Sequence, residues 1–113
     1  MARIKAIGEL SGGGGELIYP TADANDHPVF TWDYDAKCIV VFSKSNLGGV
    51  NIYSLNASSP KRWWANSSNV WQISNNPNVS NVTSRSITIN EIGTTNWDVC
   101  GIPLTEYPTG YFT

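Results

Sequence analysis

Charged residues and histidine are scarce in this chain. Only 14% of its 113 residues are charged, and there is one histidine. Globular domains average about 25% charged residues. A formal net charge of -2 without clustered lysine or arginine offers nothing for a phosphate backbone, which excludes nucleic acid as a partner. Any catalytic pair of a nucleophile with a histidine base would have to use His27, and no pattern connects His27 to a nucleophile.

Long apolar runs are also missing. No segment approaches the roughly 20 apolar residues needed to cross a bilayer, so we expect no membrane insertion. The first residues lack the apolar stretch of a secretory signal, which predicts a protein made in the cytoplasm. In that compartment Cys38 and Cys100 are expected to be reduced core thiols, with a disulfide between them as the alternative.

Helical periodicity is absent as well, and strand patterns take its place. Residues 38–42, Cys-Ile-Val-Val-Phe, are apolar on both faces, which predicts a central, doubly buried strand. Turn residues recur about every 8 to 12 positions, the spacing of sandwiches and barrels. The sequence therefore predicts an all-β single domain, an antiparallel β-sandwich or jelly-roll-like barrel of about seven to eight short strands.

Individual strands follow from alternating apolar residues. A hairpin is predicted from residues 29–32 and 37–43 through the four-residue connection 33–36. Val79 and Val82 are too sparse to predict a strand with the same clarity. The other predicted strands are 3–10, 50–55, 70–73, 86–90 and 97–100.

The chain divides into three parts by composition. Residues 1–15 form an N-terminal strand or arm that ends in a glycine hinge, because four consecutive glycines have no side chains to pack. Residues 16–102 form the β-sandwich core. Residues 103–113 form an extended aromatic tail, in which Pro103 and Pro108 interrupt any continuous ladder.

No constellation predicts catalysis, a cofactor or a metal. His27 lies near four aspartates, at 23, 26, 33 and 35, and such a loop could offer oxygen ligands to a cation. The spacing matches no ligand pattern, and aspartate is also a preferred turn residue, so a solvated hairpin loop is the favoured interpretation. We expect a non-enzymatic protein with no cofactor, no metal site and no catalytic residues.

Tryptophans supply the candidate site. Residues 63–84 contain no charged residue and include Trp63, Trp64 and Trp71. Adjacent residues of a strand face opposite sides, so one of Trp63 and Trp64 should face the core and the other solvent or a partner. An outward indole among amides serves a protein interface or a sugar platform, the latter with Asn66, Asn69 and Gln72. The interface or ligand candidates are Trp63, Trp64, Trp71, Tyr107, Tyr111 and Phe112.

In its composition, which combines low charge, a glycine hinge and an aromatic tail, the chain resembles small bacteriophage virion structural proteins. The resemblance is one of composition over the whole length and rests on no specific motif. It implies a self-associating capsid decoration, head-fibre or tail component, assembled in the host cytoplasm and located in the virion. Its partners would be copies of itself, other virion proteins and host surface glycans. The alternative function is a lectin-like carbohydrate-binding module that uses exposed tryptophans.

Overall fold

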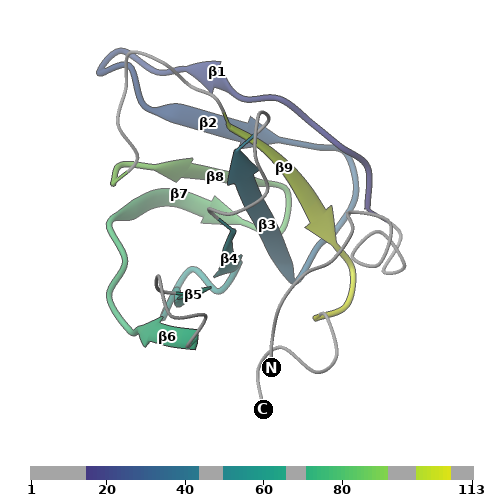
Figure 1. Cartoon of the computed structure of the whole chain (residues 1–113). Helices are drawn as coiled ribbons and strands as arrows, with labels where there is room; N and C mark the ends of the chain where they lie inside the picture. The colour runs from purple at the N-terminus through teal and green to yellow at the C-terminus, as the bar shows by residue number, and fades with distance from the viewer. Residues whose placement is uncertain (1–14, 44–49, 66–70, 92–98, 108–113) are drawn as a thin grey trace.

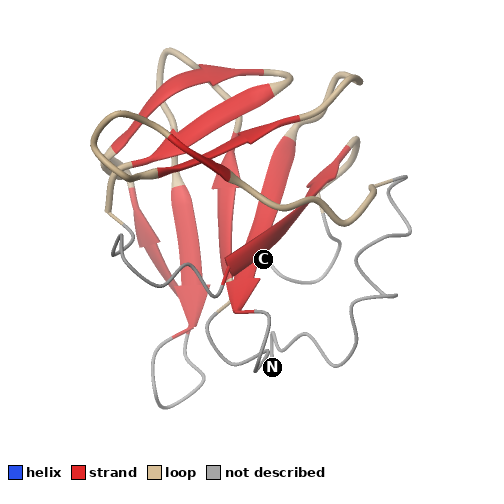
Figure 2. Cartoon of the chain, turned by 90° about the horizontal axis from the view of Figure 1, so that it is seen from above, coloured by secondary structure: helices blue, strands red, loops and turns tan. Residues whose placement is uncertain are grey.

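The computed structural model describes residues 15–43, 50–65, 71–91 and 99–107, apart from the side chains of Ser43, Ala65 and Trp71. These residues form nine strands joined by loops, and no helix occurs among them (Figures 1 and 2). It follows that this described part of the chain holds no helix long and apolar enough to cross a membrane.

The strands form two antiparallel sheets that pack as a β-sandwich (Figure 1). The four-stranded sheet has the order β1-β2-β8-β7, and the five-stranded sheet has the order β6-β5-β4-β3-β9. The strands of the first are β1 (Thr21–Ala22), β2 (Pro28–Thr31), β8 (Ser86–Ile89) and β7 (Val79–Thr83). Those of the second are β6 (Trp71–Ser74), β5 (Arg62–Ala65), β4 (Asn51–Ser54), β3 (Cys38–Ser43) and β9 (Val99–Leu104).

Strand β3 is the predicted central strand. It pairs with β4 on one side and with β9 on the other. Its alternating side chains belong to two different clusters, Ile39 and Val41 to one and Cys38, Val40 and Phe42 to the other. All five are buried, which confirms that this strand leaves neither face to water.

The space between the sheets holds the inner cluster. Phe30, Ile87 and Ile89 project into it from the four-stranded sheet, and Ile39, Val41 and Tyr53 project from the five-stranded sheet. Tyr53 carries a hydroxyl into this apolar layer and donates its hydrogen bond to Glu91 Oε1 at 3.0 Å. Facing sheets of this kind are where alternating strands bury their apolar side chains.

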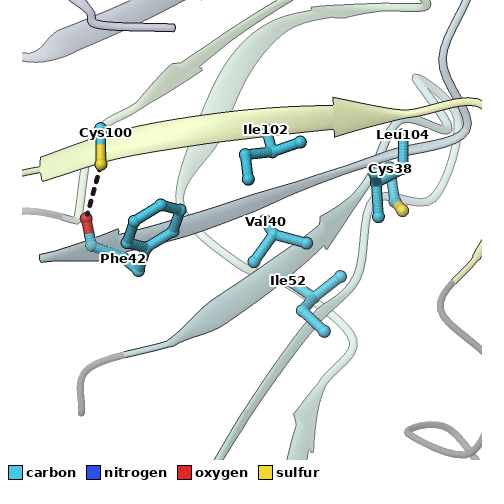
Figure 3. Close-up of a cluster of buried hydrophobic side chains, with 7 residues drawn as sticks. All are labelled: Cys38, Val40, Phe42, Ile52, Cys100, Ile102 and Leu104. Carbon is cyan, nitrogen blue, oxygen red and sulfur yellow. Dashed lines mark hydrogen bonds between the residues drawn. The ribbon is translucent and has the colours of Figure 1, made fainter. Parts of the chain in front are cut away.

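A second cluster lies on the opposite, outer face of the five-stranded sheet (Figure 3). We call it the outer cluster; it consists of Cys38, Val40, Phe42, Ile52, Cys100, Ile102 and Leu104. Both cysteines are buried and free, which confirms the prediction of reduced core thiols. They cannot pair because β3 sets Cys38 opposite Leu104, while Cys100 lies opposite Phe42 at the other end of the ladder.

The segment 15–18 runs beside β9 on its other side. Ile18 and Gly101 exchange two backbone hydrogen bonds, of 2.8 and 2.9 Å. Farther along, the Tyr34 hydroxyl accepts from the Glu16 N–H at 3.2 Å and donates to the Pro103 carbonyl at 2.7 Å. Pro103 has no N–H to donate, and its place on this outermost strand of the sheet suits a residue that weakens a ladder.

The predicted hairpin of residues 29–32 and 37–43 is wrong. Strand β2 pairs with β8, and β3 belongs to the other sheet, so residues 32–37 cross between layers. Backbone hydrogen bonds hold this crossing in place, from Trp32 N to Arg85 O and from Ala36 N to Ser84 O. A connection of hairpin length thus serves as a bridge between sheets.

Three further differences concern the four-stranded sheet and β9. Strand β7 forms despite its sparse valines, because it pairs with β8 around a register shift between Ser80 and Thr83. Alternation in the predicted strand 86–90 places Ile87 and Ile89 inward and Thr88 outward, yet Thr88 is 2% exposed. Strand β9 continues to Leu104, two residues beyond the predicted core boundary. The predicted strand 3–10 and residue Trp97 lie outside the described residues.

Candidate interaction surface

The two adjacent tryptophans of β5 face opposite sides of the five-stranded sheet, as the alternation of a strand requires. Trp63 packs against the outer cluster and is partly buried there. Trp64 lies on the other side, beneath the guanidinium of Arg62, whose Cζ is 4.4 Å from the ring centroid. The two indoles therefore belong to two different surfaces and do not form one platform.

The outer side of this end of the sheet carries an apolar patch. Strand β6 sets Ile73 opposite Trp63, and Ile73 is 51% exposed. Tyr107, which follows β9 and is 40% exposed, meets the Trp63 ring edge to face with centroids 6.3 Å apart and planes at 73°. We call Trp63, Ile73 and Tyr107 the aromatic edge.

The opposite side of the same strands is polar and internally bonded. Arg62 donates from Nε to Asn51 Oδ1 at 2.8 Å and lies 3.4 Å from Glu91 Oε1 through Nη1. Glu91 also accepts from the Tyr53 hydroxyl and from the Asn78 N–H, each at 3.0 Å. Arg62 covers one face of Trp64 and is itself bonded to Asn51 and paired with Glu91.

The unpaired edges of the two sheets differ in how they resist another strand. Strand β1 has two residues, and β7 contains the register shift and Asn81 in the left-handed region with φ 51. Strand β9 is flanked by Ile18 and carries Pro103. Each of these features hinders the addition of another strand to the edge.

Strand β6 has none of these protections. Its residues are Trp-Gln-Ile-Ser, without charge or proline, and within the described part of the chain no strand pairs with its far side. Gln72 and Ile73 are exposed. An uncharged edge strand with an exposed apolar residue is a template for pairing with another chain.

The acidic loop around His27 is built as a turn. Asp23 Oδ1 accepts the backbone N–H of Asn25 at 2.9 Å and that of His27 at 2.8 Å. The His27 hydrogen bond is the main reason that the pKa of Asp23 lies below its usual value. Asp35 is engaged elsewhere, with Ser84 and Arg85. The described residues contain no group of three side chains arranged to hold a metal ion.

The structure brings together three residues of which sequence reasoning had singled out two, Trp63 and Tyr107. Ile73 was not predicted as a site residue. Its alternation with Gln72 indicated that the two side chains face opposite sides of a strand, but only the sheet order shows that β6 is an edge strand. Arg62 was missed too, since its position over Trp64 depends on the strand geometry. Among the candidates, the Trp71 side chain, Tyr111, Phe112, Asn66 and Asn69 lie outside the described residues.

Comparisons with protein-family models, with curated proteins and with solved structures found no match to this chain. The function is therefore argued from the chain's own geometry and composition.

Proposed function

We propose that this protein is a non-enzymatic structural protein that associates with copies of itself through the β6 edge and the adjoining aromatic edge. The observation that carries the proposal is that β6 is an unprotected edge strand and that its residue Ile73 is 51% exposed. Main-chain hydrogen bonds along such an edge supply affinity, and the side chains beside it supply specificity.

The contrast between edges supports this choice of surface. The other three outermost strands of the described sheets are short, shifted in register or flanked by another segment. Natural proteins protect edge strands that must not pair with another chain, so an unprotected edge strand is a candidate for such pairing. Residues 63–84 contain no charged residue, so the sequence on both sides of β6 also lacks the charges that oppose strand pairing.

We place the assembly in a virus particle, as a phage capsid decoration, head-fibre or tail component. What supports this is the composition: 14% charged residues, no catalytic pattern, and a compact β domain followed by an aromatic tail. Mass spectrometry of purified particles checks the assignment, and we expect this chain in a fixed ratio to the major capsid protein.

Self-association is tested by replacing Ile73 with lysine. A charge at the edge should disfavour strand pairing and raise the dissociation constant at least about tenfold, which corresponds to about 1.4 kcal/mol. Light scattering over a range of concentrations measures the effect. The matched control is Thr31→Lys, which adds the same charge at an exposed position of the four-stranded sheet and should leave association unchanged.

A wild-type chain that stays a monomer at every concentration would contradict the proposal. Equal weakening by both lysine variants would show that charge in general opposes association and would remove β6 as the surface. The carbohydrate-binding alternative receives less support, because Arg62 already covers Trp64. Tryptophan fluorescence during a glycan titration should accordingly stay constant.

A further inference from the structure

The outer cluster is buried as completely as the inner one, although its cover is different. Its seven residues are 0–4% exposed. The inner cluster is covered by a whole sheet, whereas the partly buried apolar side chains packed against the outer cluster, among the described residues, are Val50 and Trp63. Figure 3 shows the seven side chains along β3, β4 and β9. Such a face calls for a further layer.

The chain reaches this face at Gly15. A Cβ built on Gly15 would collide with Ile102 Cγ2, and it would lie 2.5 Å from the Pro103 carbonyl oxygen and 2.9 Å from Leu104 Cδ2. Ile102 and Leu104 belong to the outer cluster, so the Gly15 backbone touches it directly. The hydrogen bonds of Ile18 with Gly101 fix the direction of approach.

We propose that residues 1–10 dock on the outer face of their own five-stranded sheet and form its third layer. This segment contains Ile4, Ala6, Ile7 and Leu10, an apolar set suited to the outer cluster. The four glycines 12–15 join it to the described chain at a point where only glycine fits against Ile102.

Length and connectivity favour this occupant. Ten extended residues span about 33 Å, more than the roughly 20 Å of the six-residue strand β3. A short flexible connection also gives a tethered segment an effective concentration of about millimolar, well above that of a second copy in dilute solution. The inference does not depend on the proposed self-association, which uses the β6 edge.

The two free cysteines are built-in reporters of this layer. Cys38 and Cys100 both belong to the outer cluster and lie at opposite ends of the β3–β9 ladder. The Cys100 thiol points to Phe42 O at 3.9 Å, and the Cys38 thiol to Glu106 O at 4.0 Å. Burial raises the pKa of Cys38 to about 12, which keeps this thiol unreactive while the face is covered.

The test is the rate at which a thiol-specific disulfide reagent labels these cysteines. In the intact chain both should be protected. Deletion of residues 1–10 should raise the labelling rate at least tenfold, and a synthetic peptide of residues 1–10 should restore protection. Cys38→Ser and Cys100→Ser variants assign each rate to one end of the face.

A second pair of variants keeps the full chain length, in case the deletion prevents folding. Ile4→Asn with Leu10→Asn removes apolar side chains and should speed labelling, whereas Arg3→Asn with Lys5→Asn changes the alternating polar positions and should not. Circular dichroism checks that each variant is folded.

Three results would overturn the inference. Thiols that stay protected without residues 1–10 would show that this segment is not the cover. Loss of protection only on deletion of residues 108–113 would assign the face to the C-terminal segment. Protection that falls on dilution of the intact chain would assign it to a neighbouring copy.

Discussion

At the scale of single residues, Tyr34 joins parts of the chain that are distant in sequence. Its hydroxyl bridges the Glu16 N–H, in the segment 15–18, and the Pro103 carbonyl of β9. Desolvation by burial is the main cause that raises its pKa. The hydroxyl thereby gives both the Glu16 N–H and the Pro103 carbonyl a hydrogen-bond partner.

Replacing Tyr34 with phenylalanine should remove this bridge and lower the free energy of unfolding by about 1 kcal/mol. Urea denaturation measures the loss. Amide exchange supplies the internal control, since the Ile18 and Gly101 amides should exchange faster while that of Val40, in the central strand, keeps its protection. Unchanged exchange at Ile18 would show that the segment is held without the hydroxyl.

Sequence reasoning at this scale worked where alternation alone decides the outcome. Alternation along the predicted strand 50–55 puts Val50 and Ile52 on one face and Tyr53 and Leu55 on the other, and the two clusters confirm this. The same reasoning failed at Thr88, which is 2% exposed although it lies between Ile87 and Ile89 and therefore faces away from the inner cluster. The sequence around a polar residue of a strand does not indicate that the residue is buried.

At the scale of elements, the contact of Trp63 with Tyr107 ties β5 to the segment that follows β9. Tyr107→Ala should expose the Trp63 indole and cost about 0.5–1.5 kcal/mol beyond the area lost. A red shift of tryptophan emission and a lowered urea midpoint are the expected readings. A double-mutant cycle with Trp63→Ala separates this pair from other contacts of the two rings, and a coupling energy near zero would contradict it.

Strand existence was predictable, but strand pairing was not. The run that became β3 was evident because it is apolar on both faces, and the runs that became β4, β6 and β8 were evident from alternation. The connection 33–36 resembled a hairpin turn and proved to be a crossing. Loop length limits the possible neighbours without choosing among them. Strand β7 was obscured because its pairing depends on β8 and on the left-handed Asn81, which are tertiary features.

At the scale of the whole molecule, the predicted all-β sandwich is confirmed, with nine strands among the described residues where seven or eight were expected. The doubly apolar run 38–42 located its centre correctly. The interaction surface was only partly predictable. A tryptophan pair in an uncharged stretch could be found in the sequence, but the free edge beside it follows from the order of strands.

The pH dependence of stability should have two limits. Hydrogen bonds from Ser84 and Arg85 lower the pKa of Asp35, and the His27 N–H lowers that of Asp23. Their contribution is complete above the ordinary value of 3.8 and is lost as pH falls through the lowered folded values. Burial raises the pKa of Cys38 from 9.0 to about 12, so its contribution is lost as pH rises between those values.

Urea midpoints measured from acid to alkaline pH check both limits. Asp35→Asn should make the acid limb shallower, and Cys38→Ala should do the same for the alkaline limb. A Cys38→Ala chain with the full alkaline slope would assign that slope to Tyr53, whose pKa is also raised, chiefly by burial.

The unequal protection of the sheet edges has a consequence for stoichiometry. Within the described part of the chain, three of the four outermost strands are protected, so the proposed self-association would use one edge per chain, β6. A single edge that pairs antiparallel with its own copy generates a two-fold axis, and both edges are then consumed. If the proposed contact forms, growth through it would stop at a closed dimer in which the two five-stranded sheets join into one sheet of ten strands. Any larger ring or lattice would have to be built from such dimers through a different surface.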